Sequence, residues 1–143
     1  MIVVGEVVGR WVGEGARVPW TPVSTAVGSM RGGKLVAGIL YDGYTGASIA
    51  FHARITGPES VTRDWLFAIF DYPFNQLKVK RVTGIVSSAN TRAIRAIQHF
   101  GLEYEVTLRD YFRDGDGLVY VMRKENCRWL RYPPAKKLLE VRS

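Results

Sequence analysis

Apolar and polar positions divide the first half of the chain into a short strand, a helix and three further strands. Residues 1–4 favour a strand, and residues 7–13 favour a helix that its glycines weaken. Residues 24–30, 34–42 and 47–55 have strand composition and are separated by the turn sequences RGGK and GYTG. Short turns of this kind predict an antiparallel meander.

The second half of the chain alternates helices and strands. Residues 61–72 place apolar side chains at helical spacing, residues 81–87 suit a buried strand, and residues 91–100 return to helical spacing. Gly101 stands where a left-handed cap is expected to close the last of these helices. A helix connects strands 47–55 and 81–87 as a crossover, so these two strands are expected to pair in parallel.

A hairpin is expected to follow. Residues 103–112 and 117–124 are strand-like runs joined by RDGD. The Asp and Gly residues of this turn resemble a fragment of a calcium loop but lack its remaining ligands, so a hairpin turn is the preferred interpretation. The predicted order is β-α-β-β-β-α-β-α-β-β, which indicates an α/β protein with a mixed, mostly antiparallel sheet flanked by helices.

Composition indicates a folded globular protein. The 143 residues are 47% hydrophobic and 23% charged, so we expect one domain over residues 1–143, with a basic tail from about residue 124. No apolar run approaches the roughly 20 residues that a membrane span requires. The start of the chain lacks the pattern of a secretory signal. One cysteine, Cys127, is typical of a reducing cytoplasm.

Positive charge is concentrated at the C-terminal end. Residues 123–143 hold seven cations and two acids, which is +5 of the net charge of +7. Such a segment suits nucleic acid, cofactor phosphates, an acidic partner or plain solvation. We prefer solvation and do not expect nucleic-acid binding, because that function more often spreads charge over a face with interleaved aromatic residues.

The tail also holds prolines and a short apolar patch. Pro133 and Pro134 cannot continue a strand, so residues beyond 124 are expected to be dispensable for the core sheet. Leu138, Leu139 and Val141 lie among the cations. They predict docking either on the surface of the domain or on a second copy of the chain. Docking on a second copy would form a homodimer.

The segment 81–112 carries a family resemblance. It reads RVTGIVSSANTRAIRAIQHFGLEYEVTLRDYF, with Asn-x-x-Ala, Phe-Gly-Leu and Glu-x-x-x-Leu-Arg-Asp in that order. This pattern resembles the C-terminal half of GNAT-type acetyltransferases. The run DYPFNQLKVKRVTGIVSSANTRAI and the later ENCRWL look like small GNAT-like proteins of bacteriophages, which implies a bacterial host cytoplasm. The resemblance covers about residues 34–130.

The resemblance implies the GNAT fold and acetyl-CoA as co-substrate. GNAT domains hold acetyl-CoA between two strands that splay apart, with the pantetheine along the fourth strand and the pyrophosphate at the start of the next helix. Residues 47–55 and 61–72 match that strand and that helix. The implied cofactor-binding residues are His52, Ala53, Arg54 and Ile55 along the pantetheine, Ser60, Val61, Thr62, Arg63 and Asp64 at the phosphates, and Asn90 and Arg95 on the second helical segment.

Two of these residues have a structural alternative. Asn90 is also a strong N-cap candidate for the helix over residues 91–100, and a cap and a pantetheine contact can coexist. Arg95 lies with Arg92 on the polar side of that helix, where a solvated role is the preferred interpretation.

The acid and base of the family have no counterpart here. The resemblance places the tyrosine acid at Ile97 and the glutamate base of one subgroup at Ser48. Tyr104, Tyr111 and Glu59 are local candidates, each with a structural role as the preferred interpretation. The catalytic residues therefore stay unassigned, and a metal site is not expected because the two histidines are far apart.

Two functional classes follow. The first is an N-acetyltransferase that moves an acetyl group from acetyl-CoA to a primary amine of a small molecule or a protein. The alternative is a non-catalytic GNAT-like binding protein that engages a protein or a nucleic acid. It stays open because GNAT proteins commonly carry glycines in the loop that holds the phosphates, whereas residues 61–64 contain none. Fold alone does not separate the two.

Overall fold

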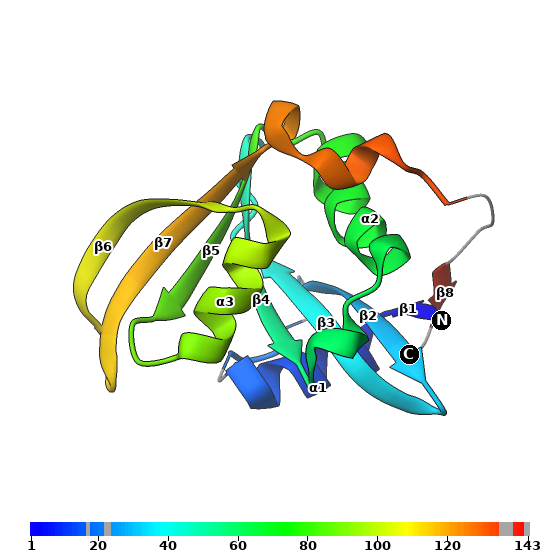
Figure 1. The fold of residues 1–143 in the computed structure, drawn as a ribbon, viewed down its shortest axis with the longest axis horizontal. Helices are drawn as coiled ribbons and strands as arrows, with labels where there is room; N and C mark the ends of the chain where they lie inside the picture. The colour runs from blue at the N-terminus through cyan, green and yellow to red at the C-terminus, as the bar shows by residue number, and fades with distance from the viewer. Residues whose placement is uncertain (17, 22–23, 135–138, 142–143) are drawn as a thin grey trace.

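An eight-stranded mixed sheet with helices on both faces organises the chain (Figure 1). This computed structural model describes residues 1–16, 18–21, 24–134 and 139–141. The strands lie in the spatial order β6-β7-β5-β4-β3-β2-β1-β8. Along the chain they are β1 (Ile2–Val4), β2 (Thr25–Arg31), β3 (Lys34–Asp42), β4 (Ser48–Ile55), β5 (Arg81–Ser87), β6 (Glu103–Phe112), β7 (Gly115–Arg123) and β8 (Leu139–Val141).

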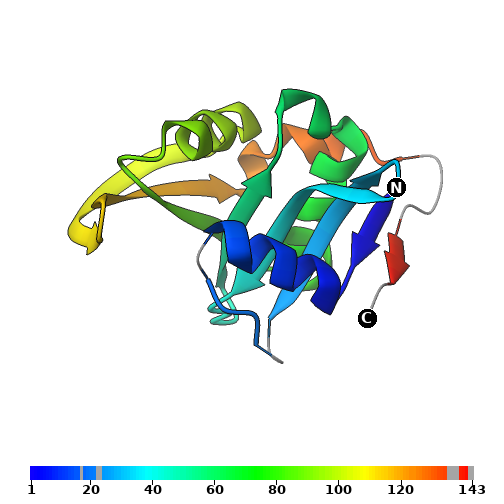
Figure 2. The ribbon, with the colours of Figure 1, turned by 90° about the horizontal axis from the view of Figure 1, so that it is seen from below.

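Helices cover both faces of the sheet. Figure 2 shows α1 on one face and α2 and α3 on the opposite face. The α-helices are α1 (Glu6–Ala16), α2 (Arg63–Asp71) and α3 (Thr91–Phe100). Shorter helical turns are the 3-10 turns η1 (Pro58–Ser60), η3 (Lys124–Asn126) and η4 (Arg128–Arg131) and the π-helical turn η2 (Tyr72–Gln76).

The pairing of the strands follows the sequence prediction. β2, β3 and β4 form an antiparallel meander, and β6 and β7 form a hairpin. β4 and β5 are parallel and are connected through α2, as the crossover predicted. In the β3–β4 pair, Leu40 lies opposite His52 and Asp42 lies opposite Ala50.

Each face of the sheet has its own apolar cluster. The larger cluster lies on the side of α2 and α3 and includes the fully buried side chains of Trp65, Phe70 and Phe100. The smaller cluster joins α1 to the other face through Val8, Val12 and Leu40, among others. Burying one large apolar side chain contributes about 1.5–3 kcal/mol, so these clusters fix the helices on the sheet.

Local residues determine where α2 and α3 begin and end. The Thr62 hydroxyl accepts a hydrogen bond from the Trp65 amide, and the Asn90 side chain accepts one from the Ala93 amide. Gly101 ends α3 with φ of 96°, a left-handed conformation that favours glycine. The predicted N-cap and C-cap of α3 are therefore both confirmed.

The end of α2 differs from the prediction. The helix was predicted over residues 61–72, yet α2 ends at Asp71 and the chain continues into the π-helical turn η2, in which Pro73 occupies the second position. A proline near the start of a helical turn loses no hydrogen bond, because the first amides of the turn have no internal acceptor. Pro73 and Phe74 are both buried there.

The expectation that the tail is dispensable for the sheet is wrong. β8 pairs in parallel with β1 and becomes an edge of the sheet. Before it, Cys127 is buried in the larger cluster, and Trp129 donates a hydrogen bond from Nε1 to the Phe100 carbonyl at 2.7 Å. Pro133 and Pro134 follow the end of η4, and the chain after them returns to the sheet. Of the apolar patch, Leu138 lies outside the described residues.

Within the residues that the structure describes, the helices are all too short or too polar to cross a lipid bilayer.

Candidate functional site

The parallel strands β4 and β5 separate partway along their length. Their pairing runs from Ser48 with Arg81 to Phe51 with Gly84, and it stops there. Beyond this point β4 continues to Ile55 while paired with β3, and β5 continues to Ser87 while paired with β7. Figure 1 shows the two strands diverging toward their C-terminal ends. The inner edges of both strands are therefore open over their last residues.

Two helices begin beside this opening. α2 follows β4, and α3 follows β5, so both helix N-termini come after the carboxyl ends of the parallel pair. Ligand sites in α/β sheets form at such ends, where neighbouring strands lead away in different directions. The first amides of a helix also lack internal acceptors and attract anions. The geometry thus combines an open strand edge with two helix N-termini.

The residues 52–55 predicted along the pantetheine all lie on the open part of β4. Ala53 and Ile55 face the larger apolar cluster. His52 faces the α1 side, because its partner Leu40 packs with residues of α1. Arg54 faces the same side as His52, since side chains alternate along a strand.

The side chain of Arg54 is engaged with α1. Its guanidinium lies 4.3 Å from the ring centre of Trp11 and donates to the Trp11 carbonyl at 2.8 Å. The Glu14 carboxylate lies 3.8 Å away. Arg54 therefore joins β4 to α1, and only its backbone remains for a ligand in the strand opening.

The residues predicted at the phosphates lie around the start of α2. The amides of Ser60 and Val61 are engaged in the turn η1, with the Gly57 and Pro58 carbonyls as acceptors. Thr62 is the N-cap, and helix geometry leaves the next two amides, those of Arg63 and Asp64, without an intrahelical acceptor. At this end, the amides that lack an intrahelical acceptor are therefore those that follow Thr62.

Side chains around these amides are polar and exposed. The Arg63 guanidinium lies 5.0 Å from the ring centre of Tyr132, which ties the start of α2 to the C-terminal segment. Asp64 is exposed and places a carboxylate in the first turn. Arg95 is exposed on α3, five positions after the cap residue Asn90.

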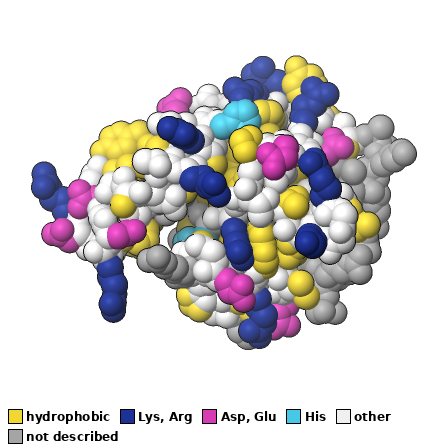
Figure 3. Space-filling view, turned by 60° about the horizontal axis from the view of Figure 1, so that its bottom comes forward, with side chains coloured by type: hydrophobic (Ala, Val, Ile, Leu, Met, Phe, Trp, Pro, Cys, Tyr) yellow, Lys and Arg dark blue, Asp and Glu magenta, His cyan; other side chains and the backbone are white. Residues whose placement is uncertain are grey.

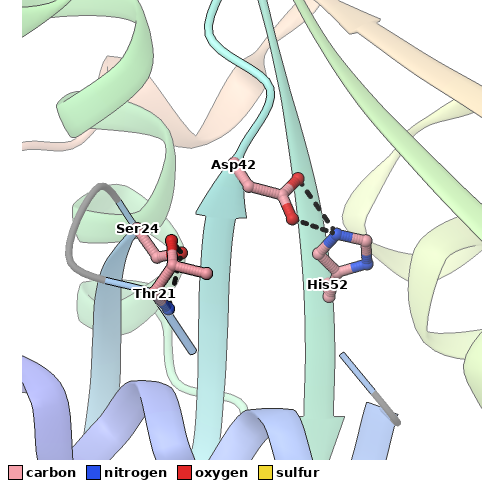
Figure 4. Close-up of polar contacts among 4 residues, drawn as sticks. All are labelled: Thr21, Ser24, Asp42 and His52. Carbon is pink, nitrogen blue, oxygen red and sulfur yellow. Dashed lines mark hydrogen bonds and ion pairs between the residues drawn. The ribbon is translucent and has the colours of Figure 1, made fainter. Parts of the chain in front are cut away.

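His52 forms a pair with Asp42 that the sequence did not predict. Its Nε2 lies 3.1 Å from both carboxylate oxygens of Asp42 (Figure 4). The His52 side chain is 20% exposed and that of Asp42 is 36% exposed. In the same figure, Thr21 and Ser24 bond to each other through their hydroxyls, 3.0 Å apart, in the loop before β2.

The hairpin register explains why the pair forms. Asp42 lies opposite Ala50, so it is the diagonal neighbour of His52 on the same face of the sheet. The turn sequence GYTG marks where the hairpin turns but not which residues pair across it, and a shift of one residue would place the two side chains on opposite faces. The pair could have been predicted only from the correct register of the β3–β4 hairpin.

A hollow of about 420 Å³ opens near the end of β3. Its walls include the aromatic residues Tyr41, Tyr44 and Tyr72, and the Thr25 and Tyr72 hydroxyls lie 3.0 Å apart within it. The lining residues are Thr25, Tyr41, Asp42, Gly43, Tyr44, Ile49, Tyr72 and Leu77. Asp42 therefore borders this hollow and also contacts His52.

The other candidate acids and bases lie apart from this pair. Ile97 is buried, and the Tyr104 hydroxyl lies 2.7 Å from that of Thr107 on β6. Tyr111 is exposed on β6, and Glu59 is exposed in η1. None of them is an observed hydrogen-bond partner of His52.

Acidic side chains and the charges on one face bear on the metal and nucleic-acid alternatives. No group of three or more His, Cys, Asp or Glu residues there has the geometry of a metal site. The Asp114 and Asp116 carboxylates accept hydrogen bonds from Ser87 and from the Asp110 amide, as parts of a hairpin turn. Figure 3 shows Lys and Arg side chains spread over one face among acidic residues rather than gathered into a single patch.

Comparison with known proteins gives structural matches alone. No family model matches the chain, and no curated protein matches its sequence. A GNAT-family acetyltransferase from Bacillus anthracis matches with a TM-score of 0.57 and 18% identity, over 71% of this chain and 66% of that protein. A spermidine N-acetyltransferase variant from Vibrio cholerae matches with a TM-score of 0.60 and 17% identity, over 75% of this chain and 69% of its own.

The matched proteins are longer than this chain. It spans 66% of the Bacillus anthracis protein and 62% of a further matched structure, less than two thirds of each. At identities this low, the similarity is one of fold. The chain has the GNAT fold, which confirms the fold class predicted from residues 81–112.

Proposed function

We propose that this protein is an N-acetyltransferase that moves an acetyl group from acetyl-CoA to a primary amine. The observation that carries the proposal is the separation of β4 and β5 after the pair Phe51 and Gly84. An open strand edge accepts an extended ligand as if it were an added strand. The pantetheine arm of CoA has amide groups that suit such pairing.

The proposed cofactor site combines this opening with the start of α2. The backbone of residues 52–55 binds the pantetheine, and the amides of Arg63 and Asp64 bind the pyrophosphate. Ser60, Val61 and Thr62 shape the turn that presents those amides. Asn90 and Arg95 complete the site from α3, with Arg95 as the cation that reaches a phosphate.

The proposed acceptor approaches from the α1 side of β4. On the opposite side, Ala53 and Ile55 pack against the apolar cluster under α2, so that side is closed to a polar amine. On the α1 side, His52 retains an exposed surface at the point where the strands separate. The thioester would be reached there without disturbing the core.

Thr62 offers a sharp test of the phosphate site. Asp is as good an N-cap as Thr, so Thr62→Asp preserves α2 but adds a negative charge beside the amides. Thr62→Ser is the matched control, because it preserves the hydroxyl without a charge. Calorimetric titration with CoA should show weaker binding for Thr62→Asp by about tenfold or more, equivalent to about 1.4 kcal/mol, and unchanged binding for Thr62→Ser.

Activity is tested by thiol release from acetyl-CoA with a panel of primary amines. The panel holds spermidine, a lysine-containing peptide and glucosamine, because they differ in charge and size. The proposal predicts amine-dependent thiol release with at least one of them. If CoA binds, and binds more weakly to Thr62→Asp than to Thr62→Ser, but no amine is acetylated, the non-catalytic alternative is favoured. Equal CoA affinity of the two Thr62 variants contradicts the proposed phosphate site.

A further inference from the structure

We infer that His52, oriented by Asp42, is the base that takes the proton from the acceptor amine. This inference rests on the proposed function and assigns a residue to a role that the sequence left open. The supporting contact is the pair of 3.1 Å distances from His52 Nε2 to the two Asp42 oxygens. No other imidazole–carboxylate ion pair occurs among the described residues.

The carboxylate determines which ring nitrogen is the base. An ionised carboxylate only accepts hydrogen bonds, so Nε2 must carry the proton that Asp42 accepts. A neutral imidazole then has its lone pair on Nδ1. Figure 4 shows Nδ1 directed away from Asp42, and no hydrogen bond to Nδ1 is observed within the described part of the chain. Nδ1 is therefore placed to accept a proton from outside the pair.

The position of His52 matches the place of the chemistry. It is the first residue of β4 after the last parallel pair, Phe51 with Gly84. The thioester of an acetyl-CoA bound in the strand opening would lie next to this residue. Its side chain faces the α1 side, from which the amine is proposed to approach. Histidine is the side chain whose charge changes most readily near neutral pH, which suits it to this task.

The proposed reaction moves two protons and one acetyl group. A protonated amine transfers one proton to His52 Nδ1, and Asp42 stabilises the imidazolium that forms. The amine nitrogen then forms a bond to the thioester carbon while the carbon–sulfur bond breaks, and the second nitrogen proton passes to the departing sulfur. His52 finally releases its proton to solvent. No oxidant, reductant or metal is needed.

Charged neighbours of the pair are few. Arg54 lies two residues further on the same face, but its guanidinium is engaged with Trp11 and lies 3.8 Å from Glu14 of α1. Asp42 is therefore the ionic partner of His52, and removing it should change the tautomer of the ring. The pair is partly exposed to solvent, so its loss should cost little stability, and this change can be measured in a folded protein.

The first test is a long-range proton–nitrogen NMR spectrum of the histidine rings. The chain has two histidines, and a His99→Gln variant identifies the signals of His52. We expect His52 to carry its proton on Nε2, and Asp42→Asn to raise the population protonated on Nδ1. Acetyl-CoA should shift the ring signals of His52 and leave those of His99 unchanged.

The second test compares turnover with the best amine of the panel. His52→Gln should lower kcat about 100-fold or more, the usual range for a lost general base, with unchanged CoA affinity. Asp42→Asn should lower kcat less than His52→Gln does. The matched control is His99→Gln, the same substitution at an exposed position on α3, and it should preserve kcat.

Several results would overturn the assignment. They are a proton on Nδ1 in the unmodified protein, an unchanged ring spectrum when acetyl-CoA binds, or a His52→Gln variant with the kcat of His99→Gln. If acetyl-CoA does not bind at all, the proposed function fails and the assignment fails with it. If acetyl-CoA binds and the panel is turned over without any effect of His52→Gln, the proposed function stands and only the base is wrong.

Discussion

Gly84 of β5 lies directly against the ring of Phe51 on β4, at the last pair before the two strands separate. A Cβ atom on Gly84 would stand 2.8 Å from Cε1 of Phe51 and 3.2 Å from Cδ1 of Ile97. The first of these distances is shorter than side-chain contacts permit. The missing side chain therefore allows the strands to pair closely at the vertex of the opening.

Replacement of Gly84 tests this contact. Gly84→Ala should destabilise the protein by about 1–3 kcal/mol, because an added methyl group overpacks a closed site. Phe51→Leu removes the ring that the methyl group meets, so the double variant should be more stable than the sum of the two single effects predicts. Urea unfolding of the four proteins measures this coupling. Additive effects would show that Phe51 is not the obstacle.

The two roles of Asn90 can be separated by substitution. Asn90→Ala removes the acceptor for the Ala93 amide and should cost about 1 kcal/mol of stability. Asn90→Ser keeps a capping oxygen and should restore most of that stability. CoA calorimetry on both variants measures the second role. If Asn90→Ser binds CoA as the unmodified protein does, Asn90 is only a cap.

Burial controls the chemistry of Cys127. Desolvation raises the pKa of its thiol to about 11, although amides of Trp129 and Leu130 oppose this shift. The native thiol should therefore resist iodoacetamide at pH 7.5 and react rapidly in urea. Folding raises this pKa above its unfolded value of about 8.5. The contribution of the Cys127 thiol to stability is therefore complete below about pH 8.5, and it declines as pH rises toward 11. Rapid native alkylation would contradict this.

Two truncations separate the parts of the tail. Ending the chain after Pro134 removes β8 and exposes β1 as an edge, while ending it after Arg123 also removes the buried Cys127 and the Trp129 contact to Phe100. The longer deletion should cost at least about 3 kcal/mol, and the shorter one clearly less. Thermal unfolding and mass measurements compare them. Equal losses would show that residues 124–134 add nothing to the core.

The order of the elements was readable from the sequence because glycines, prolines and caps mark their ends. Asn90 and Gly101 delimit α3 as predicted, and the crossover through α2 predicted the parallel pairing of β4 with β5. These features depend on residues close together in the chain. Their physical causes are local hydrogen bonds and backbone conformations, which residue types such as Asn and Gly indicate without knowledge of distant contacts.

Features that depend on distant contacts were not readable. The return of the tail to β1 as β8 requires a partner far away in sequence, whereas Pro133 and Pro134 indicated only that a strand cannot run through them. The pair of His52 with Asp42 depends on the register of one hairpin. In the proposed phosphate-binding segment 60–64, the sequence does not indicate that the amides of Ser60 and Val61 are already engaged in a turn.

The most direct test of the account is a titration of the nitrogen-labelled protein with CoA, followed by backbone amide chemical shifts. Binding in the strand opening predicts that signals of residues 52–55, 62–64 and 85–87 move together, while those of β6, on the far side of β7, stay in place. Saturation below about 1 mM CoA is expected, corresponding to more than about 4 kcal/mol of binding free energy. Unchanged spectra at that concentration, or shifts confined to the tail or to the hollow beside Tyr72, would contradict the proposed cofactor site.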